Sequence, residues 1–389
     1  MPINYLQVEK SLDTYCQSED KLQAELKTSL DRLWAQFSDP GLSSSRVREH
    51  VERAEAALRT LYCAKPSDEP LLFHKAAPHV PDAYTLVAAD GSQIAPSRHR
   101  PLQFCLINVG MIKAKHGSGE PPLIETRSEL IDHQSLYTSD GALIGEDAVS
   151  LFRDLRERTA LLDFCMQEPS PVLTLTDGPL NIYQGLLNLE QRAEVDQQIA
   201  VLNCQFRERK IISVGFIDKP GSEMISRMLA LLEVPAENLA NYDDRKREHR
   251  GVSDRALLKH LLREPGERSA VFEAITLNEQ SRSQSQQVMF FYLNISQTRE
   301  PYLVRVEFPA WIAEREDLVD LVHAVVYADS CVLENHPYPY LLHRAHELAV
   351  VSYLEADQIE NMLLQRLEAA GLLTGLRSNK EANKQLLKR

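Results

Sequence analysis

The sequence predicts an α/β protein, in which a mixed β-sheet is flanked by helices and preceded by an N-terminal helical arm. Short apolar runs bounded by glycine, proline and polar residues recur between residues 85 and 308, and such runs are typical of buried strands. Long helical segments alternate with these runs from residue 147 onwards, as in α/β domains. Before residue 65 the apolar residues instead recur at steps of three and four, which indicates helices.

Composition and charge limit the classes of function. The chain has 389 residues, of which 43% are hydrophobic and 25% charged, as in globular proteins with a sizeable core. Its formal net charge of −13 argues against a broad basic face that grips nucleic acid. A local basic groove and a cluster of carboxylates that needs a metal ion both remain compatible with this charge.

The sequence carries no signal for export or for a membrane. It contains no run of about 18 apolar residues, and its N-terminus lacks the basic and then apolar layout of a signal peptide. The six cysteines are scattered singly without a CxxC pair, which is typical of reduced thiols and not of a zinc site. We therefore expect a cytoplasmic protein with no membrane partner.

The expected helical arm covers residues 1–70. One apolar series runs from Leu22 to Phe37 at steps of four, four, three and four, and a second continues from Val47 to Leu61. Residues 1 to about 65 are therefore expected to be helical. The pattern suits a helical hairpin packed on its own domain, and it also suits a protruding arm used for dimerisation or partner docking. A proline-rich linker then leads into the main domain, residues 80–389.

The main domain is expected to begin with a sheet. In chain order we expect strands at 85–89, 102–111 and 123–129, a helix at 147–166, a strand at 171–176, a helix at 188–207 and a strand at 211–216. A polar surface loop at 234–251 falls in a variable insertion at about 234–300. Late strands are expected at 288–293 and 302–308, and residues 317–389 are expected to be mostly helical.

Two of the expected strands end in the same way. The first is followed by Asp90-Gly91-Ser92 and the other by Asp177-Gly178-Pro179. Aspartate and glycine are ordinary turn residues, so either ending alone is weak evidence of a site. Ligands of α/β sheets nevertheless gather beyond the carboxyl ends of strands. Two carboxylates that converge there repel each other, and a hard divalent cation such as Mg²⁺ or Mn²⁺ relieves the repulsion.

A third carboxylate lies on the helix between these strands. Glu157 falls outside the apolar stripe that contains Phe152, Leu155 and Leu162, so it is either a solvated edge residue or a buried metal ligand. Glu146 and Asp147 are better explained as acids that favour the start of a helix. Two glutamates on the preceding strand, Glu125 and Glu129, are weaker rivals.

The C-terminal stretch YPYLLHRAH brings together a tyrosine and two histidines. Pro339 suits the first turn of a helix, which places Tyr338 at the start of that helix. His346 follows Tyr338 by eight residues, so both side chains and His343 can approach one site. A histidine on such a helix is more often structural, but neutral imidazole also binds metals and transfers protons.

These motifs, taken together, resemble the NurA nuclease family. The resemblance rests on DGSQI with a basic run after it, DGPL, GERSAVF and YPYLLHRAH, and it extends from about Tyr84 to about Glu355 with the segment 252–272 included. It implies an RNase H-like core that cuts DNA with Mn²⁺. It further implies a single-strand endonuclease and 5′ to 3′ exonuclease of end resection in double-strand break repair. A homodimer and a HerA-type hexameric ATPase partner are implied in the same way.

The resemblance also assigns roles to residues. It puts catalytic residues at Asp90, Glu157, Asp177, Tyr338 and His346, and all of these except Tyr338 are expected to hold Mn²⁺ (or Mg²⁺). Glu157 matches by lying on the helix before the second aspartate, 20 residues before Asp177. The second motif reads DGPL where a DGS-like sequence is common, and Pro179 removes one backbone donor.

Basic residues are expected to contact the DNA backbone. Arg98, His99 and Arg100 follow the first motif directly. Arg245, Lys246 and Arg247 form a second candidate group, for which ordinary solvated surface is the better interpretation.

Two other functions compete with a DNA nuclease. One is an RNase H-like phosphodiesterase that acts on RNA or nucleotides, and the other is a non-catalytic subunit that docks a DNA-translocating ATPase. The intact set of candidate site residues argues against the non-catalytic subunit, because a protein that no longer catalyses a reaction tends to lose its metal ligands.

Overall fold

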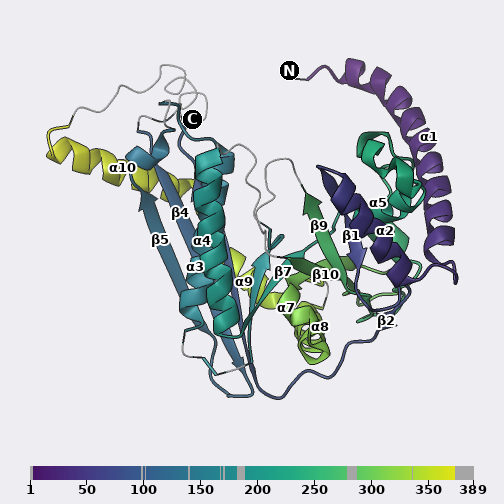
Figure 1. Cartoon of the computed structure of the whole chain (residues 1–389). Coiled ribbons are helices and arrows are strands. Elements are labelled where there is room, and N and C mark those ends of the chain that lie inside the picture. Colours follow the sequence, from purple (N-terminus) through teal and green to yellow (C-terminus); the bar gives the residue numbers. More distant parts are fainter. Residues whose placement is uncertain are drawn as a thin grey trace. The chain divides into compact units, whose positions relative to one another are not determined.

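The structure is a computed structural model that describes residues 3–97, 100, 102–138, 141–166, 168–169, 171–181, 189–277, 287–334 and 336–372. The chain divides into two compact units, each with its own strands and helices (Figure 1). The first unit comprises residues 1–79 and 216–337, and the second comprises residues 80–215 and 338–389. In the described part of the chain, no helix is both long enough and apolar enough to cross a membrane.

The second unit is built on a mixed sheet whose strand order is β7-β6-β3-β4-β5. Its strands are β3 (Tyr84–Ile94), β4 (Cys105–His116), β5 (Leu123–Ile131), β6 (Val172–Asp177) and β7 (Ile211–Ile217), where the chain leaves the unit. β3, β4 and β5 pair antiparallel in sequence order, whereas β6 runs parallel to β3. This order is that of an RNase H-like core. The predicted fold, a mixed sheet flanked by helices, is therefore confirmed.

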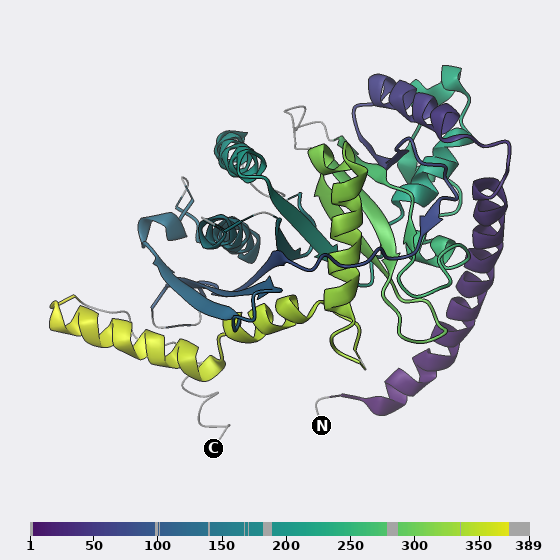
Figure 2. The same ribbon diagram turned by 90° about the horizontal axis from the view of Figure 1, so that it is seen from below.

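Helices cover both faces of this sheet. They are α3 (Glu146–Phe164), α4 (Leu189–Glu208), α9 (Tyr340–Ala349) and α10 (Tyr353–Ala369), with a short 3₁₀ turn η1 (Gln134–Leu136). Val87 and Ala89 of β3 pack with Leu161 of α3 in one apolar cluster, while Gly110 of β4 lies against α9. Because alternate residues of a strand face opposite sides, α3 and α9 occupy opposite faces, as Figure 2 shows for the teal and yellow-green helices.

β3 is longer than the sequence predicts. The strand was expected to end at Ala89, but it continues to Ile94 because its antiparallel pairing with β4 extends to Ile94 opposite Leu106. The parallel pairing with β6 stops at Ala89 opposite Thr176. Asp90 therefore lies inside β3, at the residue where the strand loses one of its two neighbours. Asp177 is the last residue of β6.

The first unit combines a second group of strands with the N-terminal helices. Its strands are β1 (Leu61–Pro66), β2 (His74–Lys75), β8 (Arg268–Ser269), β9 (Phe272–Leu277), β10 (Val288–Asn294) and β11 (Leu303–Pro309). They follow the order β1-β9-β10-β11, with β8 joined to β10 and β2. Its helices are α1 (Tyr5–Phe37), α2 (Ser44–Ala57), α5 (Met224–Leu232), α6 (Asp254–Leu258), α7 (Ala310–Ala313) and α8 (Glu316–Ser330), with 3₁₀ turns η2 (Ala236–Asn241) and η3 (Asp244–Lys246).

The N-terminal helices form part of the core of the first unit. Leu33, Phe37, Val47 and Val51 are buried in one apolar cluster with residues of α5. This packing favours a hairpin on its own domain, although the first turns of α1 expose apolar side chains: Tyr5, Leu6, Val8, Leu12 and Tyr15. The prediction of helix up to about residue 65 is wrong for residues 61–65, because Leu61–Pro66 pairs with β9 as strand β1.

Candidate active site

The two Asp-Gly motifs lie side by side on neighbouring strands. β3 and β6 are parallel, and their last printed pair is Ala89 opposite Thr176. The next residue on each strand is an aspartate, Asp90 on β3 and Asp177 on β6. Neighbouring strands are about 4.8 Å apart, and residues in register share a face of the sheet. The register therefore directs both carboxylates to the face covered by α9, with Asp177 exposed and Asp90 partly buried.

Asp90 has a defined hydrogen-bond partner for each of its oxygens. His346 Nδ1 on α9 lies 2.6 Å from Asp90 Oδ2, a hydrogen bond that an imidazole with its proton on Nδ1 donates to the carboxylate. The backbone N–H of Gly91 donates to Oδ1 at 2.8 Å. The His346 side chain remains 63% exposed, against 17% for Asp90. The pair thus engages one imidazole nitrogen, Nδ1, on a side chain that is otherwise largely exposed.

α9 reaches Asp90 because β4 carries a glycine beneath it. Gly110 is the residue opposite Asp90 in the register, and a Cβ built on it would lie 2.6 Å from the carbonyl oxygen of Ala345. The end of α9 is hydrogen-bonded to the sheet: Ala349 O accepts from Asn108 Nδ2 at 2.8 Å and from the Ser92 hydroxyl, and Leu348 O accepts from Asn108 Nδ2 at 3.4 Å. These contacts fix the distance between α9, which carries His346, and strand β3.

Glu157 approaches the same strand from the opposite face. A Cβ built on Gly91 would lie 2.5 Å from Glu157 Oε1 and 2.6 Å from Arg153 Cγ, so the carboxylate occupies the space that a side chain at residue 91 would fill. Glu157 is only 7% exposed, and Arg153 Nε lies 3.2 Å from its Oε1. Of the two interpretations given to Glu157, the structure supports a buried carboxylate beside Asp90.

Burial disfavours the ionised form of the Glu157 carboxyl group. Desolvation raises the pKa of Glu157 from 4.5 to about 8, repulsion from Asp154 and Asp90 adds to the rise, and attraction to Arg153 opposes it. The pairing with Arg153 is thus too weak to compensate for the loss of water. A buried acid of this kind beside two further carboxylates fits a site that a divalent cation completes.

The turn after Asp177 is held by α3 and β7. Gly178 has φ +102°, a conformation that side chains rarely adopt. The buried Arg158, next to Glu157 on α3, donates to the carbonyl oxygen of Leu180. On β7, a Cβ at Gly215 would lie 2.7 Å from the Gly178 carbonyl oxygen. α3 therefore touches both motifs, through Glu157 at the first and Arg158 at the second.

The C-terminal candidates separate in the structure. Tyr338 is half-buried and lies two residues before α9, whereas Pro339 is the N-cap and not a first-turn residue, because the helix begins at Tyr340. His346 contacts Asp90, but His343 lies 3.5 Å from Glu347, so it is held on the exposed side of its own helix.

The rival glutamates have other partners. Arg127 Nε lies 2.7 Å from Glu125 Oε1, and Arg156 Nε lies 2.7 Å from Glu129 Oε2. Glu146 and Asp147 are exposed in the first turn of α3, as expected for acids at a helix start.

The basic candidates are only partly described. Arg98 and His99 lie outside the described residues. Arg100 Nη1 lies 2.8 Å from Glu360 Oε2 on α10, so its charge is already paired. In the second group the Arg247 side chain is buried against Glu223 and Asp244, whereas Arg245 and Lys246 are exposed.

The candidate ligands suit a hard divalent ion, but their donor atoms do not yet surround a single metal position. Carboxylate oxygens are the donors that Mn²⁺ and Mg²⁺ prefer, and imidazole is compatible with Mn²⁺. Among the four described residues expected to bind metal (Asp90, Glu157, Asp177 and His346), no three bring donor atoms within 4.8 Å of one another. Binding of an ion therefore requires these side chains to move closer together, against the repulsion between the carboxylates.

Several residues that build the site were missing from the sequence predictions. Gly110, Asn108 and Ser92 place α9, and Arg153 and Arg158 flank Glu157. The Arg153–Glu157 spacing of four residues was a visible signal, since such pairs meet on one helix face. The role of Gly110 depends on the register between β3 and β4, and the sequence alone does not show that register.

Three solved structures are similar to this chain. They are the NurA nuclease from Sulfolobus solfataricus (10% identity, TM-score 0.45, covering 84% of this chain and 94% of that chain), the catalytic domain of human endonuclease V (14%, 0.36, 82% and 96%) and endonuclease V from Bacillus subtilis (12%, 0.34, 75% and 86%). No curated protein matches the sequence. The NurA domain family model matches residues 84–351, more than half of the chain. The chain therefore belongs to the NurA family and is a nuclease of DNA repair, an enzyme that hydrolyses phosphodiester bonds.

Proposed function

We propose that this chain is a metal-dependent DNA nuclease that cuts single strands internally and degrades DNA ends from 5′ to 3′ during end resection. The observation that carries the proposal is the meeting of His346 and Glu157 on either side of Asp90-Gly91, next to Asp177 on the adjacent strand. Asp90, Glu157, Asp177 and His346 hold one or two Mn²⁺ (or Mg²⁺) ions. When bound, the metal lowers the pKa of a water molecule and stabilises charge on the leaving oxygen.

The residues of the chain have separate tasks in this proposal. Asp90 fixes the His346 imidazole through Nδ1, so that Nε2 can contact a metal or accept a proton. Glu157, whose pKa is raised to about 8 by burial, must give up its proton before it can act as a ligand at neutral pH. The Tyr338 hydroxyl donates a hydrogen bond to a phosphate oxygen. Arg98, His99 and Arg100 contact the DNA backbone, and Arg100 must first leave Glu360.

Membership of the family supports a proposal for the biological setting. The nuclease works in the cytoplasm as a homodimer beside a HerA-type hexameric ATPase that translocates DNA. The exposed apolar side chains in the first turns of α1 support a protein contact there. Pull-down of a HerA-type ATPase by the full chain, with an α1 variant that carries Leu6→Ser and Tyr15→Ser as comparison, tests this setting separately from catalysis.

Cleavage of end-labelled single- and double-stranded DNA with Mn²⁺, Mg²⁺ or EDTA tests the activity. Wild type is compared with Asp90→Asn, Asp177→Asn and Glu157→Gln, and the matched controls are Glu125→Gln and Glu129→Gln. We expect metal-dependent cutting that falls roughly 10³-fold in the first three variants and persists in the controls. Cutting that survives Asp90→Asn and Asp177→Asn would locate the chemistry elsewhere. Preferential cutting of labelled RNA would favour an RNA phosphodiesterase.

A further inference from the structure

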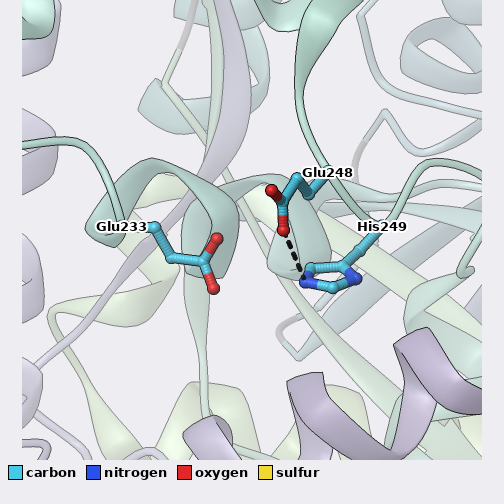
Figure 3. Close-up of side chains that lie close together, drawn as sticks. All are labelled: Glu233, Glu248 and His249. Atoms are coloured by element: carbon cyan, nitrogen blue, oxygen red, sulfur yellow. Dashed lines mark ion pairs between the residues drawn. The ribbon is translucent and has the colours of Figure 1, made fainter.

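Two glutamates and a histidine of the first unit lie close together. Glu233 follows the last turn of α5, and Glu248 and His249 follow the 3₁₀ turn η3 (Figure 3). Each residue offers one ligand atom, and the three atoms all lie within 4.8 Å of one another. Among the described residues, these three form the one group of His, Cys, Asp or Glu side chains whose ligand atoms lie this close together.

The histidine of this group is buried with a nitrogen that lacks a hydrogen bond. The His249 side chain is 8% exposed, and within the described part of the chain no group hydrogen-bonds to its Nε2 atom. The same nitrogen faces Glu248, whose Oε2 lies 3.8 Å away, beyond hydrogen-bond distance (Figure 3). A buried polar atom without a partner destabilises a fold, so its presence points to a ligand that satisfies it.

We propose that Glu233, Glu248 and His249 form a second metal site, which binds a divalent transition-metal ion of the Zn²⁺ type. Imidazole nitrogen together with carboxylate oxygen is a donor set that zinc accepts, with bonds of about 2.0–2.2 Å. The proposed nuclease site, with three carboxylates (Asp90, Glu157 and Asp177) beside His346, is richer in the oxygen ligands that harder ions prefer. The two glutamates are exposed, so their side chains are free to close the remaining distance to the ion.

Arg32 of α1 is the protein's own counter-ion for these carboxylates. Its guanidinium nitrogens lie 3.6 Å from Glu233 Oε1 and 3.3 Å from Glu248 Oε2, and its side chain is 61% exposed. An exposed pair at these distances contributes little to stability. Arg32 leaves His249 Nε2 without a partner, whereas a metal ion satisfies all three side chains at once. Arg32 and the ion therefore compete for the same carboxylates.

Such an ion would fasten the end of α5 to the segment 248–249 that follows η3. Its role is to stabilise the first unit, and it does not depend on the proposed nuclease mechanism. Zinc binding and protection against unfolding are therefore measurable in a chain that cannot hold the other metal.

The experiment uses the full chain with Asp90→Asn and Asp177→Asn, and with the exposed Cys16 and Cys204 replaced by serine to remove adventitious thiol ligands. The metal-stripped protein is titrated with Zn²⁺ against a chromophoric chelator, and thermal unfolding is followed with and without zinc. Into this parent we introduce Glu248→Gln and His249→Asn separately. Asparagine is chosen because residue 249 has φ +60°, a conformation that asparagine tolerates. The matched control is Glu237→Gln, an exposed glutamate four residues after Glu233.

We expect the parent and Glu237→Gln to bind one equivalent of zinc and to gain thermal stability from it. Glu248→Gln and His249→Asn should each lose roughly tenfold or more in affinity together with the gain in stability. Arg32→Ala should bind zinc more tightly than the parent, because it removes the competing charge. No zinc uptake by the parent, or uptake unchanged in both ligand variants, would overturn the proposal. Neither result bears on the nuclease, whose aspartates are absent from every protein tested.

Discussion

The two Asp-Gly motifs look alike in sequence and are built differently. At the first, Asp90 is partly buried and bonded to His346, and Gly91 is needed because any side chain there would meet Glu157 and Arg153. At the second, Asp177 is exposed, and Gly178 is needed because its backbone has φ +102°. No described atom lies within 4 Å of a Cβ built on Gly178. One glycine makes space for a carboxylate, and the other makes a turn.

This difference predicts which motif tolerates change. The first motif is assembled from three elements, β3, α3 and α9, so a small displacement there separates the candidate ligands. At the second, Arg158 of α3 and Gly215 of β7 hold the turn after Asp177, so a change at Gly178 acts mainly on the stability of that turn.

Among the substitutions that test this comparison, Gly91→Ala is expected to have the largest effect. The added methyl group displaces Glu157, and a shift of about 1 Å in a catalytic group costs on the order of 100-fold in rate. Cleavage of labelled single-stranded DNA in Mn²⁺ measures the loss. A variant that is folded, as judged by its melting temperature, and retains wild-type activity would show that Glu157 has no part in the reaction.

Gly110→Ala tests the contact that brings α9 to the first motif. Its methyl group would meet the Ala345 carbonyl oxygen, which lifts α9 and parts His346 from Asp90. We expect a loss of activity of about tenfold or more and a loss of stability of about 1–3 kcal/mol. His346→Ala provides the matched control, since it breaks the same hydrogen bond without moving the helix. If Gly110→Ala were as active as wild type while His346→Ala were inactive, the placement of α9 would be unimportant.

The raised pKa of Glu157 should make the metal-free protein less stable as the pH rises. The folded chain keeps a proton that the unfolded chain loses between pH 4.5 and about 8, so this contribution is fully present at low pH and is lost as pH rises through the folded pKa. The slope is at most about 1.4 kcal/mol per pH unit. Urea unfolding in EDTA should show it in wild type and not in Glu157→Gln. Equal slopes in both proteins would mean that Glu157 ionises normally.

Gly178→Ala is expected to have the smallest effect on catalysis. The strained backbone costs about 1–3 kcal/mol of stability, while the ligands at the first motif are undisturbed. Chemical denaturation measures the cost, and cleavage by the folded variant should stay within a few-fold of wild type. A loss of activity as deep as that of Gly91→Ala would contradict the distinction between the two motifs.

Short apolar runs and helical periodicity were enough to predict much of the second unit. The helix at 147–166 and the strands at 171–176 and 211–216 lie within two residues of α3, β6 and β7 at each end. The extension of β3 past Asp90-Gly91 was missed, because pairing with β4 holds residues that would otherwise favour a turn. β1 was read as helix, since its strand character comes from β9, some 200 residues away in the chain.

The sequence was enough to predict which residues belong to the candidate site, but not which contacts they make. Asp90 and Asp177 were predicted from their places at strand ends, and the register of β3 and β6 makes them neighbours. The burial of Glu157 depends on the missing side chain at Gly91, and the contact of His346 depends on Gly110. Both are tertiary effects that helix periodicity does not contain. They also explain why the spacing of Glu157 from Asp177 was a poor guide to its place.

The most direct test of the site is the position of manganese in crystals soaked with Mn²⁺, located by its anomalous scattering. We predict a peak ligated by Asp90 and Asp177, with Glu157 as a further ligand, and its loss in Asp90→Asn crystals. A manganese peak that leaves all three carboxylates uncoordinated, for example at Glu125 or Glu129, would contradict this assignment.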